Sequence, residues 1–140
     1  MKILLAVDGS GFTKKMLAYL ATHDEWLGAT HSYTLVTVQT PLPPRARAAV
    51  GAEIANGFYA DEAEKVSAPV VKFLKRHGIN VEVVHKVGSP GEMIAKIANA
   101  GKFDLLMMGS HGHGAFGNLV MGSVATKVLA QCKVPVLLVR

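Results

Sequence analysis

Five apolar runs along the chain have the length and pattern of β-strands. Runs that are apolar on both faces, rich in Val, Ile, Leu and Met, are typical of strands buried in a parallel sheet. The first run stops at Asp8-Gly9-Ser10, a sequence that favours a turn, and the second stops before Pro41. The predicted strands cover residues 2–7, 33–38, 81–87, 104–108 and 134–139.

Four segments between these strands repeat apolar residues at the spacing of an α-helix. The first helix is capped by Ser10 and ends before Gly28, and the others cover about 54–77, 90–100 and 123–131. Because strand and helix alternate, the pattern predicts an α/β fold: a doubly wound, five-stranded parallel sheet with helices on both faces. The 140 residues are expected to form a single domain, 1–140.

Several positions predict how these elements begin and end. Gly78 is placed to cap the helix over 54–77, which Pro69 is expected to kink. The sequence Ser89-Pro90-Gly91-Glu92 has the form of a capping box. Residues 39–52 carry three prolines and a glycine, which predicts a surface loop.

Composition and charge narrow the class of protein. Half of the residues are hydrophobic, as in a packed globule. The net charge is +5, but Lys and Arg are scattered and no nucleic-acid-binding motif accompanies them, so a nucleic acid partner is not expected. The apolar run at the N-terminus is too short for a signal peptide or a membrane-spanning helix. Together with the single cysteine, Cys132, which cannot form an intramolecular disulfide, this predicts a cytoplasmic protein without a membrane contact.

The segment after the fourth strand is rich in glycine, with five glycines from Gly109 to Gly122 inclusive. Ligands of open parallel sheets bind outside the carboxyl ends of the strands. Glycine lets backbone N–H groups approach an anion, and Gly122-Ser123 opens a helix whose N-terminus favours phosphate. We interpret the segment as an anion cradle; the alternative is a flexible surface loop.

Two known phosphate-binding motifs and a zinc site do not account for this segment. The Walker pattern is absent, because no lysine precedes Ser123. Residues 112–117 match the dinucleotide pattern GxGxxG, but no acidic residue follows at the required distance, so the match is accidental. His111 and His113 lack the further ligands of a zinc site and are expected to be solvated loop histidines.

The spacing Gly109, two residues, Gly112, nine residues, Gly122-Ser123 closely resembles the nucleotide-binding signature of the universal stress protein family. The resemblance extends to residues 3–10, 105–112 and 134–139. It implies the strand order 3-2-1-4-5, which makes Asp8 and Gly109 neighbours across a crevice.

The chain resembles the ATP-binding branch of that family. This resemblance implies that Asp8 lies near the nucleoside and any Mg²⁺, with Ala6 and Val7 on the adjoining wall of the site. It places Val38 against adenine. The alternatives are that Asp8 only forms a turn and that Val38 only packs in the core. The ribose and first phosphate would contact Met108, Gly109, His111 and Gly112, and the outer phosphates would contact Gly122, Ser123, Val124 and Ala125.

Two further features bear on the phosphates. Many relatives carry Thr near Ala125, and that hydroxyl is missing here unless Thr126 supplies it. Arg45 and Arg47 could close over the phosphates as a lid, but a charged tip on a proline-rich loop is usually solvated.

The resemblance implies an ATP-binding regulatory protein of the stress response that forms a homodimer through its last strand. An apolar edge strand over 134–139 invites such pairing. The alternatives are a slow ATP hydrolase, for which only Asp8 and the loop histidines could serve, and a structural stress protein that binds no nucleotide. At most a weak ATPase activity is expected.

Overall fold

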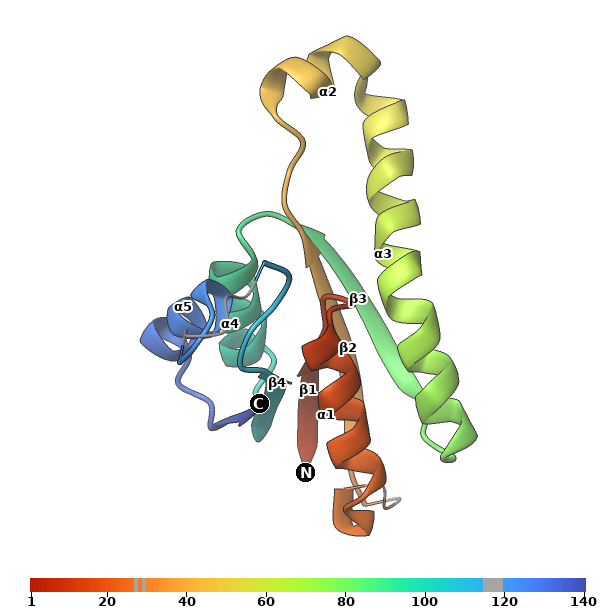
Figure 1. The fold of residues 1–140 in the computed structure, drawn as a ribbon, viewed down its shortest axis with the longest axis vertical. Coiled ribbons are helices and arrows are strands. Elements are labelled where there is room, and N and C mark those ends of the chain that lie inside the picture. The colour runs from red at the N-terminus through yellow and green to blue at the C-terminus, as the bar shows by residue number, and fades with distance from the viewer. Residues whose placement is uncertain (27, 29, 115–119) are drawn as a thin grey trace.

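The protein is described by a computed structural model covering residues 1–26, 28, 30–114 and 120–140 (Figure 1). The GxGxxG match over residues 112–117 lies partly outside the described residues. The strands are β1 (Lys2–Ala6), β2 (Ser32–Gln39), β3 (Val81–Val87), β4 (Leu105–Gly109) and β5 (Val136–Val139). The helices are α1 (Gly11–Ala21), α2 (Pro44–Val50), α3 (Ala52–Arg76), α4 (Pro90–Ala100) and α5 (Ser123–Gln131), with a short 3₁₀ turn over Asp24–Trp26.

The five strands form one parallel sheet in the order β3-β2-β1-β4-β5, which confirms the predicted fold. Leu5 illustrates the register, since it pairs with Leu35 of β2 on one side and with Met107 of β4 on the other. All three side chains are fully buried, as the unbroken apolar runs of the sequence require.

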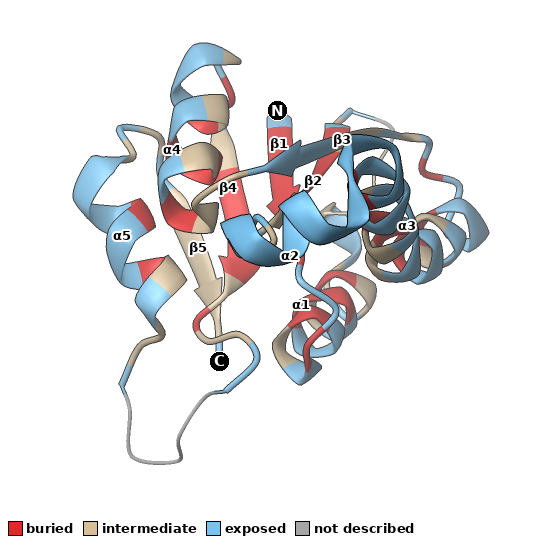
Figure 2. Ribbon diagram, turned by 90° about the horizontal axis from the view of Figure 1, so that it is seen from above, coloured by how far each residue is buried: buried red, intermediate tan, exposed pale blue. Residues whose placement is uncertain are grey.

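Helices cover both faces of the sheet (Figures 1 and 2). On one face, α1 and α3 pack on a core that includes Ile3, Leu5 and Leu35. On the other face, α4 and α5 pack on a core that includes Leu4 and Leu106. Neighbouring residues of β1 therefore enter different cores, because successive side chains of a strand point to opposite faces.

Residues 39–52 do not all form the loop that their prolines predict. Residues 44–50 form α2, which stands with the first part of α3 beyond the carboxyl ends of the strands (Figure 1). Pro44 occupies the first turn, where its missing N–H costs nothing, and the Ala and Arg residues that follow favour a helix. Proline thus starts a helix here, whereas we had interpreted it as a loop signal.

Some of the predicted helix caps are present in the structure and one is not. Ser10 caps α1, accepting a hydrogen bond from the Phe12 N–H at 3.3 Å, and Gly78 follows α3 with a φ of +75°. The capping box at Ser89 is wrong: its side chain makes no capping bond, and only its carbonyl joins the helix, accepting from the Met93 N–H. Helix α3 continues through Pro69 as one element.

The topology opens a crevice at the carboxyl ends of β1 and β4. From the end of β1 the chain continues into α1 on one face, whereas α5, after β4, packs on the other face. Adjacent loops that depart in opposite directions leave room for a ligand between them. Within the described ranges, no helix is both long and apolar enough to cross a membrane.

Candidate functional site

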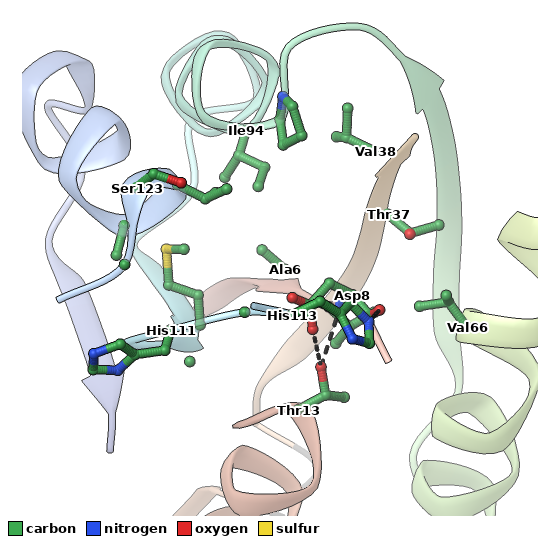
Figure 3. Close-up of a pocket in the computed structure, with 18 of the residues that line it drawn as sticks. Ala6, Asp8, Thr13, Thr37, Val38, Val66, Ile94, His111, His113 and Ser123 are labelled. Atoms are coloured by element: carbon green, nitrogen blue, oxygen red, sulfur yellow. Dashed lines mark hydrogen bonds between the residues drawn. The ribbon is translucent and has the colours of Figure 1, made fainter. Parts of the chain in front are cut away.

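A cavity of about 660 Å³ lies at this crevice, at the carboxyl ends of β1, β2 and β4 (Figure 3). Its size falls within the range of small-molecule sites. Every residue that the sequence analysis assigned to the site lines it: Ala6, Val7, Asp8, Val38, Met108, Gly109, His111, Gly112, Gly122, Ser123, Val124 and Ala125. The fold therefore brings together in space residues from four separate segments of the chain.

Other lining residues were not expected. Thr37, Gln39 and Thr40 end or follow β2, so the rule that led to Val38 could have found them. Helix α3 contributes Glu62 and Val66, and nothing in their local sequence indicates a site. The remaining unexpected lining residues are Thr13, Pro90, Ile94, His113 and Gly114.

Asp8 is held in place by the first turn of α1. Its Oδ1 accepts a hydrogen bond from the Ser10 N–H at 2.9 Å and another from the Thr13 hydroxyl at 3.1 Å. The Thr13 hydroxyl in turn accepts from the Asp8 N–H at 3.2 Å. Asp8 therefore forms the expected turn and also lines the cavity, so the two interpretations of this residue are compatible (Figure 3).

The two loop histidines make specific contacts, contrary to the expectation that they are merely solvated. The His113 Nε2 lies 2.7 Å from the Asp8 carbonyl oxygen. His111 packs against the Phe12 ring with 4.9 Å between centroids, and its Nδ1 lies 2.8 Å from the Ser110 hydroxyl. His113 therefore contacts the end of β1, and His111 packs against the first turn of α1.

Three glycines of the signature lie where the chain passes close to itself. A Cβ on Gly109 would lie 2.6 Å from the Phe12 Cβ, and one on Gly112 would lie 2.5 Å from the Asp8 Oδ2. At Gly122, a Cβ would lie 3.0 Å from the His111 Cα. The glycines thus let the loop after β4 lie against both Asp8 and the N-terminus of α5.

Helix α5 begins at the cavity without a side-chain cap. Gly122 is its N-cap, and its N–H donates to the Ser110 carbonyl at 2.7 Å. The N–H groups of Ser123, Val124 and Ala125 precede the first intrahelical bond, which the Thr126 N–H makes. No acceptor for these three groups exists among the residues that the structure describes, and all three residues line the cavity.

Thr126 does not supply the hydroxyl that is missing near Ala125. Its side chain donates to the Gly122 carbonyl at 2.8 Å and is not part of the cavity lining. Arg45 and Arg47 lie on α2 and do not line the cavity either.

Metal-ligating side chains are sparse at the site. In the described part of the chain, no group of three or more His, Cys, Asp or Glu side chains is arranged to hold a metal ion. The acidic residues of the lining are Asp8, at the end of β1, and Glu62, which is paired with Lys65 at 3.0 Å.

A comparison of the chain with known protein families identifies its family. The model of the universal stress protein family matches residues 1–140. The chain belongs to the universal stress protein family. The resemblance seen in the glycine spacing is thereby confirmed.

Curated universal stress proteins match almost the whole chain. The protein Slr1230 of Synechocystis is 36% identical over 140 residues, which are 99% of this chain and 42% of that protein. The chain therefore spans less than half of the length of that relative. A universal stress protein of Thermus aquaticus is 35% identical over 139 residues, which are 99% of this chain and 97% of that protein.

Solved structures of universal stress proteins have the same fold. The protein MJ0577 of Methanocaldococcus jannaschii superposes with a TM-score of 0.81 at 28% identity, covering 99% of this chain and 94% of that one. An Archaeoglobus fulgidus protein in complex with dAMP gives 0.71 at 20% identity, covering 100% and 98%. An Arabidopsis thaliana protein with AMP bound gives 0.69 at 16% identity, covering 99% and 90%. The last two likenesses concern the fold alone.

Proposed function

We propose that the protein binds an adenine nucleotide, ATP by preference, in the cavity at the carboxyl ends of β1, β2 and β4, and that it serves as a regulatory protein of the stress response. One observation carries the proposal. A single cavity joins backbone N–H groups of α5 that have no acceptor in the described part of the chain to apolar walls at the ends of two strands. The first feature suits phosphate and the second suits a purine.

The phosphates are assigned to the N-terminus of α5. The N–H groups of Ser123, Val124 and Ala125 supply donors, the helix dipole favours negative charge, and the Ser123 hydroxyl adds a further donor. Glycine at position 122 lets the loop over His111 and Gly112 approach the same point.

The base is assigned to the apolar part of the lining. Ala6 of β1 pairs with Met108 of β4, and both line the cavity. Val38 and Ile94 lie on the same side of the pocket (Figure 3). These side chains belong to or pack against the core on the α4 and α5 face, so they present a fixed apolar surface. A flat aromatic base buries more apolar area there than a sugar or a phosphate does.

The nature of the ligand is supported by structural neighbours. Proteins of the same fold have been solved with dAMP and AMP bound, so adenine nucleotides are ligands within this fold family. The preference for a triphosphate rests on this chain, in which three helix N–H groups and the Ser123 hydroxyl face one end of the cavity. More phosphate oxygens can be bound there than AMP offers.

Asp8 fits a role in holding Mg²⁺ beside the phosphates. Proteins commonly bind Mg²⁺ through one or two carboxylates together with the phosphates of the ligand. The Asp8 Oδ1 is occupied by the Ser10 and Thr13 bonds, so the Oδ2, beside Gly112, is the oxygen that would take part. Bound Mg²⁺ would neutralise phosphate charge.

Binding, rather than turnover, is the proposed activity. Phosphoryl transfer to water requires a positioned base and cationic groups on the γ-phosphate. None of the described lining residues is Lys or Arg. We expect phosphate release far slower than ~10 per second, the enzyme median. Rapid release that disappears in Asp8→Asn would replace this proposal with a hydrolase.

We also propose that the protein forms a homodimer through β5. Among the described residues this strand is an edge of the sheet and pairs with β4, so the N–H and C=O groups on its other side are left for a further strand. A second copy related by a twofold axis would satisfy them.

The experiment that tests the proposed function is recovery of the ligand from the purified protein. The protein is denatured, and the released small molecules are identified by mass spectrometry. An adenine nucleotide, released in proportion to the protein, is expected. The Gly122→Val variant, purified in parallel, should release far less. Protein that carries no nucleotide and takes up none when ATP is added would refute the proposal.

A further inference from the structure

Thr37 is a buried polar residue of the cavity lining to which the proposed function assigns no role. It lies in β2, one residue before Val38, and only 2% of its surface is exposed. Its hydroxyl makes no hydrogen bond within the described ranges, yet the residue is part of the cavity lining. In Figure 3 the Thr37 side chain stands at the margin of the pocket, opposite Ser123.

Most buried polar side chains of this protein have partners. Ser10 and Thr13 are buried to a similar degree, and each hydroxyl is hydrogen-bonded near the end of β1. Among the described residues, the fully buried side-chain nitrogen or oxygen without a partner is the Trp26 Nε1, so the Thr37 Oγ1 is open to the cavity rather than sealed in the core. The hydroxyl at position 37 is therefore accessible to a hydrogen-bond partner that occupies the cavity.

The strand geometry defines the part of the cavity that Thr37 faces. Val36 and Val38 belong to the α4 and α5 side of the sheet, whereas Leu35 belongs to the α1 and α3 side. Because side chains alternate, Thr37 lies on the side of Leu35, in a cavity that Val66 of α3 and Asp8 also line. The phosphate-binding start of α5 lies on the opposite side of the pocket (Figure 3).

We propose that the Thr37 hydroxyl hydrogen-bonds the nucleoside part of the bound nucleotide, and so helps to select the ligand. This inference rests on the proposed function, since it assigns the nucleoside to the β2 end of the same cavity. Asp8 has a different role in the proposed site, because its Oδ1 is bonded to Ser10 and Thr13 and its Oδ2 is assigned to Mg²⁺. A hydroxyl can both donate and accept, so it can pair with either kind of polar group on a base or ribose.

The test compares Thr37→Val with Thr37→Ser, and uses Thr34→Val as the matched control. Thr34 lies on the same strand but outside the cavity, so the control makes the same chemical change where no ligand is expected. Binding of AMP, ADP and ATP is measured by calorimetry for each variant. Thr37→Val should lose affinity about tenfold, which is the effect of one hydrogen bond of about 1.4 kcal/mol.

Comparing the affinities for AMP, ADP and ATP distinguishes a contact with the nucleoside from a contact with the phosphates. If Thr37 contacts the nucleoside, Thr37→Val weakens AMP, ADP and ATP by the same factor, while Thr37→Ser and Thr34→Val bind as the wild type does. A loss that appears only with ADP and ATP would overturn the inference, as would unchanged binding by Thr37→Val. A wild type that binds none of the three ligands would instead refute the proposed function.

A stability measurement accompanies the series. Because the hydroxyl has no protein partner, ligand-free Thr37→Val should melt at or above the wild-type temperature. A lower melting temperature would show that the hydroxyl is bonded within the protein, and would overturn the inference independently of any ligand.

Discussion

The Thr13 hydroxyl and the Asp8 backbone and carboxylate are bonded to each other in both directions. Thr13 Oγ1 accepts from the Asp8 N–H at 3.2 Å and donates to the Asp8 Oδ1 at 3.1 Å. This pair joins the first turn of α1 to the end of β1. It determines which carboxylate oxygen remains available to the cavity.

Replacing Thr13 by valine should therefore weaken Mg²⁺-dependent nucleotide binding, although valine keeps the methyl group of threonine and nearly the same shape. Loss of the two bonds should also lower the free energy of unfolding by about 1–2 kcal/mol. Thr13→Ser retains the hydroxyl and should bind ATP as the wild type does. Calorimetry and thermal unfolding measure the two effects. Equal affinities for the valine and serine variants would show that Asp8 needs no such support.

Substitution of Gly122 should reduce ATP affinity in proportion to the size of the new side chain. A Cβ there would lie 3.0 Å from the His111 Cα and 3.3 Å from the Ser110 carbonyl oxygen, so the loop must move away from α5. Gly122→Ala should lose a little affinity and Gly122→Val at least about tenfold, which corresponds to ~1.4 kcal/mol. Circular dichroism should remain native.

The control for this prediction is Gly57→Val. A Cβ on Gly57, in α3, would meet no atom within 4 Å, and the residue does not line the cavity. Its ATP affinity should match that of the wild type. Normal ATP binding by Gly122→Val would place the phosphates elsewhere.

The raised pKa of Tyr33 predicts how the free energy of unfolding changes at alkaline pH. The phenol is buried and donates a hydrogen bond to the Trp26 carbonyl, and burial raises the pKa of Tyr33 from 10.0 to about 12. The unfolded chain loses this proton near pH 10 and the folded protein does not. The contribution of Tyr33 to stability is therefore complete below pH 10 and is lost as the pH rises toward 12.

Denaturant unfolding, followed through the fluorescence of Trp26, tests this expectation. Tyr33→Phe should be less stable than the wild type at neutral pH, because the hydrogen bond to the Trp26 carbonyl is lost. The difference between the two proteins should shrink between pH 10 and 12. A difference that stays constant across this interval would contradict the raised pKa.

The proposed dimer predicts that charges on β5 dissociate the protein. Val136 and Leu138 lie on this edge strand and are partly buried against the core on the α4 and α5 face. Light scattering should give twice the chain mass of 14.9 kDa for the wild type and a single chain for Val136→Lys with Leu138→Lys. Val87→Lys, at the end of the opposite edge strand β3, is the control and should remain dimeric. A monomeric wild type at micromolar concentration would remove the proposed interface.

The sheet could be predicted from the sequence because its strands are buried on both faces, and such runs carry a strong signal. The strand order came from the family resemblance rather than from the runs themselves. Helix α2 was missed because Pro44 marks a helix start as readily as a loop, and only the Ala and Arg residues after it favour the helix.

The residues of the candidate site could likewise be predicted only in part. Residues at strand ends and in the glycine segment could be found, because both features have a local signature. Glu62 and Val66 could not, since they reach the cavity only through the packing of α3 against the sheet. The close contacts of Gly109 with Phe12 and of Gly112 with Asp8 likewise exist only in the folded chain, although glycine at both positions was noted.

Calorimetric titration of nucleotide-free protein with ATP in the presence of Mg²⁺ tests the central claim most directly. We predict one ATP per chain with a dissociation constant in the micromolar range. The same ligand should raise the melting temperature, because binding to the folded state alone adds ~2.7 kcal/mol at a hundredfold excess over the dissociation constant. No heat of binding and no thermal shift at millimolar ATP would contradict the account.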